Sequence, residues 1–187
     1  MKRNDNRRYK RTVIAVMSLA LAAGMTGVAV NAATDRNHSV SITAAAEESA
    51  AGKYSVNIQL MQFHSEELSM GNESMLPQAQ IVVNTDGTSS IEIDMQSLTY
   101  LGRDGYLGWL KKVTKVISEN RFQYPTEIET EDAAVLEEYT DVYDAFNTPD
   151  SEYADTQVTG KWYPKKLSIP IDFENRDDDI LVQVYVI

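Results

Sequence analysis

The fold is decided by Lys53–Leu98, a stretch that opens with Lys-Tyr-Ser-Val-Asn-Ile-Gln-Leu-Met-Gln-Phe. Apolar and polar side chains alternate along this opening run, and the apolar positions are Tyr54, Val56, Ile58 and Leu60. A period of two is typical of a strand that buries one face. The alternation returns at 79–83 and 91–95, and Asp86-Gly87 between these runs is a tight-turn dipeptide. The stretch therefore predicts three strands around one apolar core.

A different pattern fills the connection between the first two of these strands. It reads Ser-Met-Gly-Asn-Glu-Ser-Met at 69–75 and is followed by Pro77. Met70 and Met75 each follow a serine, which is an unusual choice for a plain surface loop. We expect a short helical connector here. Methionine fills irregular gaps in protein cores, so packing and ligand binding are both open as roles for the two methionines.

Further strands are predicted in the second half of the chain. Tyr106–Ile117 is rich in β-branched and aromatic residues without one strict period, which indicates a bend. Lys165–Asp172 alternates, and Pro170 within it indicates a sheet edge or a bulge. Ile180–Ile187 is apolar on both faces and is therefore expected to be central in its sheet. Roughly seven strands separated by turns predict an all-β fold of the sandwich type.

The acidic segment 119–157 is the exception to this strand pattern. Within it, Glu131–Phe146 spaces its apolar residues as an amphipathic helix does, at Val135, Tyr139, Val142 and Phe146. Thr130 is a suitable N-cap, and Pro149 would end the helix. We therefore expect one helix in this insertion. Its many carboxylates lack the spacing and the central glycine of a calcium loop, which favours a solvated acidic surface.

The first 33 residues have the composition of an export signal. Basic residues gather at the start, and an apolar run of small residues extends from Thr12 to Val30. Val30-Asn31-Ala32 has the small-x-small pattern of a signal-peptidase site, so we expect residues 1–33 to be a signal peptide that is cleaved close to Ala33. An uncleaved membrane anchor is the alternative, because the run is almost long enough to span a bilayer.

The remaining chain divides into a linker and a domain. Residues 34–50 are small and polar and predict a linker, which leaves 51–187 as the folded domain. The chain has 187 residues and a formal net charge of −11, and it becomes more acidic once the basic N-terminus is removed. Such a surface repels phosphate backbones, so we expect no nucleic-acid partner. We expect the mature domain to be secreted or held at the cell surface, and not embedded in a membrane.

Composition also argues against an enzyme. The chain has no cysteine, which excludes disulfides, thiol catalysis and thiolate ligands. With two histidines, it offers little material for the nucleophile–base pairs of hydrolases. The basic patch formed by Lys111, Lys112 and Lys115 has two interpretations. It protects a strand edge, or it contacts an anionic ligand or an acidic partner.

The order of these segments resembles a NEAT (near-iron-transporter) domain. The matching pieces are Gly-Lys-Tyr-Ser-Val-x-Ile-x-Leu, Ser-Met-Gly-Asn, Pro-x-Ala-x-Ile-Val-Val-Asn-x-Asp-Gly and Ile-Glu-Ile-Asp-Met. The resemblance covers 52–110 and returns at 162–187. It implies an immunoglobulin-like β-sandwich on a bacterial cell surface that binds haem or a haem protein for iron uptake. The alternative within the same resemblance is a module that binds a surface protein or a glycan without haem.

The resemblance also implies which residues form the haem site. Ser69 matches the serine that binds a haem propionate, with Met70 beside it and Met75 nearby. Haem-binding members carry a Tyr-x-x-x-Tyr pair on the last strand, and the first tyrosine of the pair ligates ferric iron. Tyr185 stands at the second position, whereas Leu181 occupies the first and cannot ligate iron. The expected cofactor is therefore haem, with an incomplete set of ligands.

Overall fold

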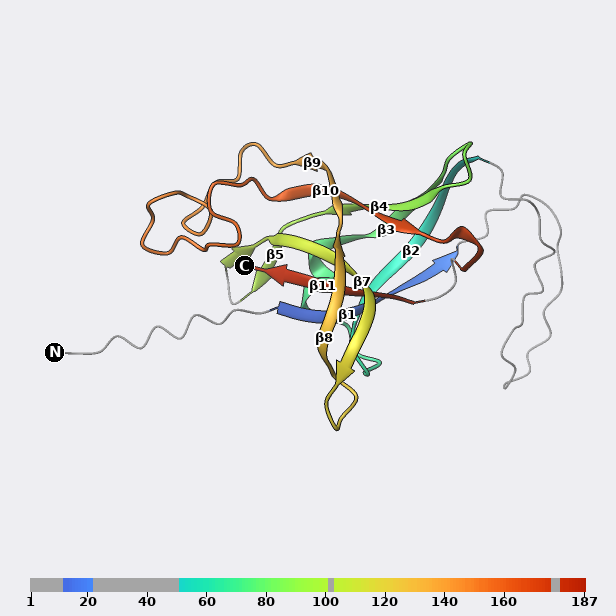
Figure 1. Cartoon of the computed structure of the whole chain (residues 1–187). Coiled ribbons are helices and arrows are strands. Elements are labelled where there is room, and N and C mark those ends of the chain that lie inside the picture. The colour runs from blue at the N-terminus through green and yellow to red at the C-terminus, as the bar shows by residue number, and fades with distance from the viewer. Residues whose placement is uncertain (1–11, 22–50, 101–102, 176–178) are drawn as a thin grey trace, which may run out of the picture.

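The computed structural model describes residues 12–21, 51–100, 103–175 and 179–187, and this part of the chain is almost entirely β-structure (Figure 1). Its strands are β1 (Thr12–Leu21), β2 (Gly52–Gln62), β3 (Met75–Val83), β4 (Ser89–Met95), β5 (Leu98–Tyr100), β6 (Arg103–Gly105), β7 (Leu107–Glu119), β8 (Pro125–Asp132), β9 (Ala134–Glu138), β10 (Pro164–Ile171) and β11 (Ile180–Val186). Two short 3-10 helices complete the list, η1 (Met70–Ser74) and η2 (Phe173–Asn175). The prediction of an all-β fold is confirmed.

Nine of these strands form one antiparallel sheet in the order β8-β7-β11-β1-β2-β3-β4-β10-β9, while β5 and β6 pair separately. The sheet folds over on itself, so that β10 lies against β7 and Lys112 Nζ donates to the carbonyl of Pro170 at 2.8 Å. The result is a two-layer sandwich. Segment 125–138 passes from β8 at one sheet edge to β9 at the other, and the Ala133 N–H donates to the Leu110 carbonyl at 3.0 Å where the chain crosses.

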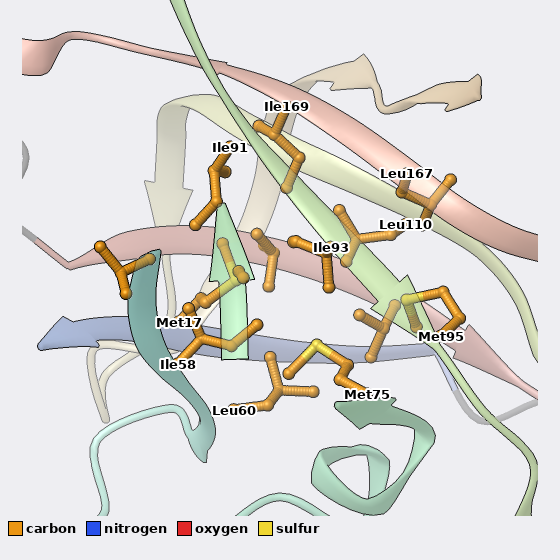
Figure 2. Packing of buried hydrophobic residues seen from close by; sticks show 14 of the residues in the cluster. Met17, Ile58, Leu60, Met75, Ile91, Ile93, Met95, Leu110, Leu167 and Ile169 are labelled. Atoms are coloured by element: carbon orange, nitrogen blue, oxygen red, sulfur yellow. The ribbon is translucent and has the colours of Figure 1, made fainter. Parts of the chain in front are cut away.

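The core lies between the two layers and is made by inward-facing residues at alternating positions along the strands (Figure 2). Strand β2 contributes the residues that its alternation predicted, and Val56, Ile58 and Leu60 are all buried. Matching residues come from the other strands, including Ile91, Ile93, Leu110, Leu167, Ile169, Val182 and Val184. Burial of one face per strand explains why a period of two runs through most of the sequence.

Two finer predictions about strand position hold. Strand β11 lies between β7 and β1, which explains why its sequence is apolar on both faces. Strand β9 pairs only with the Pro164–Ser168 part of β10, so Pro170 lies beyond the end of β9. A proline cannot donate a backbone hydrogen bond, and the open edge at this point requires none.

The predicted helix over Glu131–Phe146 is wrong. This part of the chain contains the end of β8, then β9, then turns. On β8, Glu131 pairs in register with Lys112, and on β9, Val135 pairs with Leu167. Sheet neighbours of opposite charge and β-branched side chains favour strand over helix here, and an isolated helix with this many acidic side chains repels itself. Val135, expected on the buried face of the helix, is half exposed.

Strand β1 belongs to the segment predicted as a signal peptide. It runs antiparallel to β2 and to β11 and lies between them, and Met17 is fully buried. The expected cleavage site close to Ala33 and the predicted linker at 34–50 lie outside the described residues, so both stay predictions. Among the residues that the structure describes, no helix is long and apolar enough to cross a membrane.

The turn between β3 and β4 fixes their register. Gly87 has a φ of 84°, in the left-handed region, and its N–H donates to the Asn84 carbonyl at 3.1 Å. The Asp86 carboxylate accepts from both the N–H and the hydroxyl of Thr88, at 2.9 and 2.6 Å, and these bonds lower its pKa. Space around Gly87 is open, so the requirement for glycine comes from the backbone angle alone.

We predict that Gly87→Ala lowers the free energy of unfolding by about 1 kcal/mol, because alanine is strained at positive φ. Gly87→Asn is the matched control, since asparagine tolerates this conformation, and its effect should be clearly smaller. Urea unfolding followed by circular dichroism measures both. An alanine variant as stable as the wild type would show that the turn does not depend on a left-handed residue.

Candidate functional site

The connector after β2 is fixed to the end of that strand. The Ser69 N–H donates to the Leu60 carbonyl at 2.7 Å, and the Leu60 N–H donates to Asn72 Oδ1 at 2.8 Å. The Ser69 side chain is the N-cap of η1 and accepts from the Gly71 N–H at 3.3 Å. A Cβ on Gly71 would lie 3.1 Å from the Leu60 side chain, so η1 packs closely on β2. The predicted helical connector is thus confirmed as η1.

The other end of η1 is tied to the chain that leaves β4. Gln96 donates its N–H to the Ser74 carbonyl at 2.9 Å and its side-chain Nε2 to the Glu73 carbonyl at 3.0 Å. Ser74 is fully buried, and its hydroxyl donates to the Gly71 carbonyl at 2.6 Å. These bonds satisfy the buried polar groups of the connector and hold η1 beside the start of β5.

A cleft of about 490 Å³ lies between η1, the start of β3 and the start of β5. Its size falls within the range of about 300–1,000 Å³ that is typical of small-molecule sites. The lining mixes apolar side chains with amides, hydroxyls and one carboxylate, and consists of Ile58, Asn72, Glu73, Met75, Leu76, Pro77, Gln96, Ser97, Leu98 and Thr99. Leu76 is 40% exposed, so an apolar side chain is accessible in this cleft.

The structure brings part of the predicted haem site together. Ser69 is buried as the N-cap of η1, and Met70 begins η1 with 52% of its surface exposed. Met75 is buried in the main core and also lines the cleft. These three residues therefore belong to one connector. Met75 therefore has the packing role that was one of the two alternatives, whereas Met70 is exposed and its role stays a prediction.

The two predicted residues of the last strand point elsewhere. Val186 lies close to η1, since a Cβ on Gly71 would be 3.7 Å from its Cγ2. Successive side chains of a strand point to opposite faces, so Tyr185 points away from η1. Tyr185 is buried in a second apolar cluster with Val158 and Tyr163. Leu181, half-buried, is paired in register with Val16 of β1.

Tyr185 is held by a partly buried hydrogen bond. Its hydroxyl donates to Asp155 Oδ2 at 2.8 Å, and its ring stacks on Trp109 with centroids 5.4 Å apart. Burial, followed by the hydrogen bond to the Asp155 carboxylate, raises the pKa of Tyr185 to about 12. At neutral pH the side chain is therefore a phenol that donates to a carboxylate. A phenolate ligand for iron is not present in this arrangement.

Tyr163 repeats the same interaction nearby. Its hydroxyl contacts both oxygens of Asp144, at 3.0 and 2.9 Å, and its ring stacks on Tyr106 with centroids 5.0 Å apart. Burial, followed by the hydrogen bond to Asp144, raises its pKa well above the ordinary value. Two phenol–carboxylate pairs thus hold one loop in place. Asp155 of the loop is bonded to Tyr185 on β11, and Asp144 of the loop is bonded to Tyr163, just before β10.

We call residues 139–163, between β9 and β10, the tyrosine loop. It is internally ordered by Asn147, which is fully buried and whose Nδ2 donates to the Lys161 carbonyl at 3.0 Å. The loop packs closely on β7, where a Cβ on Gly108 would lie 2.9 Å from Val158 and 3.0 Å from Tyr185. Any larger side chain at position 108 would displace the loop, which explains the glycine.

The lysine patch on β7 is paired across the sheet. Lys111 contacts Asp132 at 2.8 Å, Lys115 lies 4.0 Å from Glu129, and Lys112 bonds to β10 as described above. The first interpretation, protection of a strand edge, does not hold, because β7 lies between β8 and β11. The lysines instead form cross-strand contacts within the sandwich. Within the described ranges, no group of three or more histidine or acidic side chains is placed to hold a metal ion.

Comparisons with known proteins found no family model, no curated protein and no solved structure that matches this chain. The likeness to NEAT domains therefore stays a prediction from the quoted residues. Function has to be argued from the cleft, from η1 and from the face covered by the tyrosine loop.

We predict that alkaline titration separates Tyr185 from the exposed tyrosines. Its folded pKa lies above the unfolded value near 10, so its contribution to stability is present below pH 10 and is lost as the pH rises towards 12. Absorbance at about 295 nm should show a late ionisation step that is smaller in Tyr185→Phe. Tyr124→Phe, at an exposed residue, is the matched control and should retain the late step. An unchanged late step in Tyr185→Phe would contradict the assignment.

Proposed function

We propose that this protein is an exported binding module of the NEAT type and that its ligand enters the cleft beside η1. The observation that carries the proposal is the cleft itself, next to a connector held by Ser69 and Asn72. Binding sites concentrate where loops are held by a rigid scaffold, and this connector is bonded to β2 at one end and to Gln96 at the other. Haem is the first ligand to test.

The apolar part of the cleft lining suits the porphyrin ring of haem. Leu76, Leu98 and Met75 contribute apolar side chains to the lining, and Ser97 and Thr99 contribute hydroxyl groups. Carboxylate groups of a ligand need such neutral donors, because the protein as a whole repels anions. Glu73 in the same lining disfavours a ligand carboxylate close to its own.

Iron ligation by tyrosine does not fit. Tyr185 is committed to Asp155 and points away from η1, and Leu181 has no ligand atom. Haem held in the cleft would depend on apolar contact, because Met70, the exposed thioether of the connector, is not part of the cleft lining. We therefore propose binding without a tyrosinate bond.

The test is a titration of the purified protein with ferric haem, followed by the Soret band. We predict binding without a tyrosinate signature and a loss of affinity of about tenfold or more in Leu76→Glu, because a buried charge costs more than 1.4 kcal/mol. Leu136→Glu on β9 is the matched control, since Leu136 is equally apolar, 51% exposed and absent from the cleft. Met70→Ala tests whether the exposed thioether of η1, which is outside the cleft lining, contributes to haem binding.

Two results would contradict this proposal. Equal affinities for Leu76→Glu and the wild type would place haem outside the cleft. A tyrosinate spectrum that disappears in Tyr185→Phe would show that the tyrosine loop leaves its position and that the last strand ligates iron after all.

A second candidate is a module for a surface protein or glycan, and one observation favours it. Two aromatic rings of the tyrosine loop, Tyr143 and Trp162, are exposed at the surface. They are in edge contact, with 4.9 Å between their centroids. Paired exposed aromatics are uncommon on a surface without a partner, and sugar rings stack on them. In this case Trp162→Ala should abolish glycan or protein capture while leaving haem titration unchanged. Loss of haem binding in Trp162→Ala would reject the separation of the two surfaces.

A further inference from the structure

One wall of the cleft lies outside the nine-stranded sheet. Residues 96–99 line the cleft, and we call them the β5 wall. Strand β5 pairs with β6 in a two-stranded sheet that is separate from the large one. Two strands of three residues each are marginal in isolation. The position of the β5 wall therefore depends on contacts outside this pair.

The first residue of the β5 wall is bonded to the connector. Gln96 donates its N–H to the Ser74 carbonyl at 2.9 Å and its side-chain Nε2 to the Glu73 carbonyl at 3.0 Å. These bonds join the wall to η1 and are the contacts that a movement of the wall would break. They hold the wall from the η1 side only.

Tyr139 contacts the residue just before the β5 wall. It follows the last residue of β9, and its N–H donates to the Tyr163 carbonyl at 2.9 Å, so its backbone is fixed beside the start of β10. Its hydroxyl donates to the carbonyl of Met95 at 2.9 Å. Met95 is the last residue of β4, and the pairing of β10 with β4 extends only to Asp94. The phenol of Tyr139 therefore supplies a donor at a point that β10 does not reach.

The same tyrosine also contacts the residue that follows β6. The ring of Tyr106 is in edge contact with the ring of Tyr139, with 5.8 Å between centroids. On the same residue, the ring of Tyr163 stacks at 5.0 Å. The segment that carries the β5–β6 pair is thus held by Tyr139 at both ends, through Met95 before the pair and through Tyr106 after it.

We propose that Tyr139 is a positioning residue of the cleft, which fixes the β5 wall relative to η1. Tyr139 is not among the lining residues, so it acts through Met95 and Tyr106 and not by touching a ligand. The tyrosine loop, orange in Figure 1, begins at this residue, so the loop that carries the exposed aromatic pair also fixes one wall of the cleft. The effect on a ligand rests on the function proposed above, whereas the position of the wall depends on no ligand.

A role in overall stability alone would have a different consequence. Loss of a contact that only stabilises the fold raises the opening of all segments together, whereas loss of a positioning contact opens the wall locally. Hydrogen exchange of single amides separates these two cases. The Gln96 amide reports on the wall, because it donates to the Ser74 carbonyl. The Ile93 amide reports on global unfolding, because Ile93 is buried in β4 between β3 and β10.

The test is Tyr139→Phe, which removes the hydroxyl and keeps the ring that contacts Tyr106. We expect native-state hydrogen exchange, followed by NMR, to become faster at Gln96 by about fivefold or more, because one hydrogen bond is lost beside the wall. Exchange at Ile93 should stay within about twofold of the wild type. No change at Gln96, or an equal change at Gln96 and Ile93, would overturn the proposal.

Tyr185→Phe is the matched control. It also removes a phenol hydrogen bond of the tyrosine loop, the bond to Asp155, which involves neither Met95 nor Tyr106. Exchange at Gln96 should be unchanged in this variant. An equal increase in both variants would show that any loosening of the loop reaches the cleft, and the specific role of Tyr139 would be rejected.

Titration with ferric haem adds a readout at the cleft itself. We expect Tyr139→Phe to weaken haem binding by roughly three- to tenfold, whereas Tyr185→Phe stays within about twofold of the wild type. Faster exchange at Gln96 with unchanged haem affinity would overturn the positioning role. A wild type that binds no haem would reject the function proposed above, and the ratio of exchange at Gln96 and Ile93 would still decide whether Tyr139 holds the wall.

Discussion

The hydrogen bonding of β2 on both edges is the constraint on which the rest of the structure depends. Its first half pairs with β3, and its second half pairs with β1 on the opposite edge. Where β3 leaves, the connector takes over, because Leu60 exchanges hydrogen bonds with Ser69 and Asn72. A buried backbone group without a partner costs about 1–3 kcal/mol, so η1 is placed by the need to satisfy this strand. Beyond Asn57, η1 replaces β3 as the neighbour of β2, and the cleft lies beside η1 at this point.

Acidic residues in this protein are used in a way that net charge does not reveal. Asp144 and Asp155 accept hydrogen bonds from buried tyrosines and need no cation beside them. A carboxylate that accepts a hydrogen bond from a phenol keeps its charge at a lower desolvation cost than an unpaired carboxylate does. The same bonds raise the pKa of Tyr185, so they stabilise the loop and remove the phenolate together. Leu181, which has no ligand atom, and the hydrogen bond of Tyr185 to Asp155 therefore both disfavour ligation of iron by the last strand.

The strands were predictable where the pattern of apolar and polar residues alone determined them. Val56, Ile58 and Leu60 on β2 and Val182 and Val184 on β11 are buried as their patterns required. The prediction of a helix over Glu131–Phe146 was wrong, because the spacing of apolar residues cannot show that β7 and β10 pair with this segment. The connector was recognisable from its serine and methionines, but the cleft needed Gln96 and Leu98 from a distant segment. The second cluster around Tyr163 and Tyr185 depends on contacts of the tyrosine loop that no local pattern encodes, among them the close approach of Val158 to Gly108.

Ile58 connects the cleft with strand β1. Its side chain is buried in the main core and lines the cleft, and its backbone pairs in register with Leu19 of β1. Packed interiors transmit small displacements, so the pairing of β1 with β2 and the shape of the cleft are not independent. The strand that satisfies the second edge of β2 therefore also fixes one part of the candidate site, because both require Ile58 in its buried position.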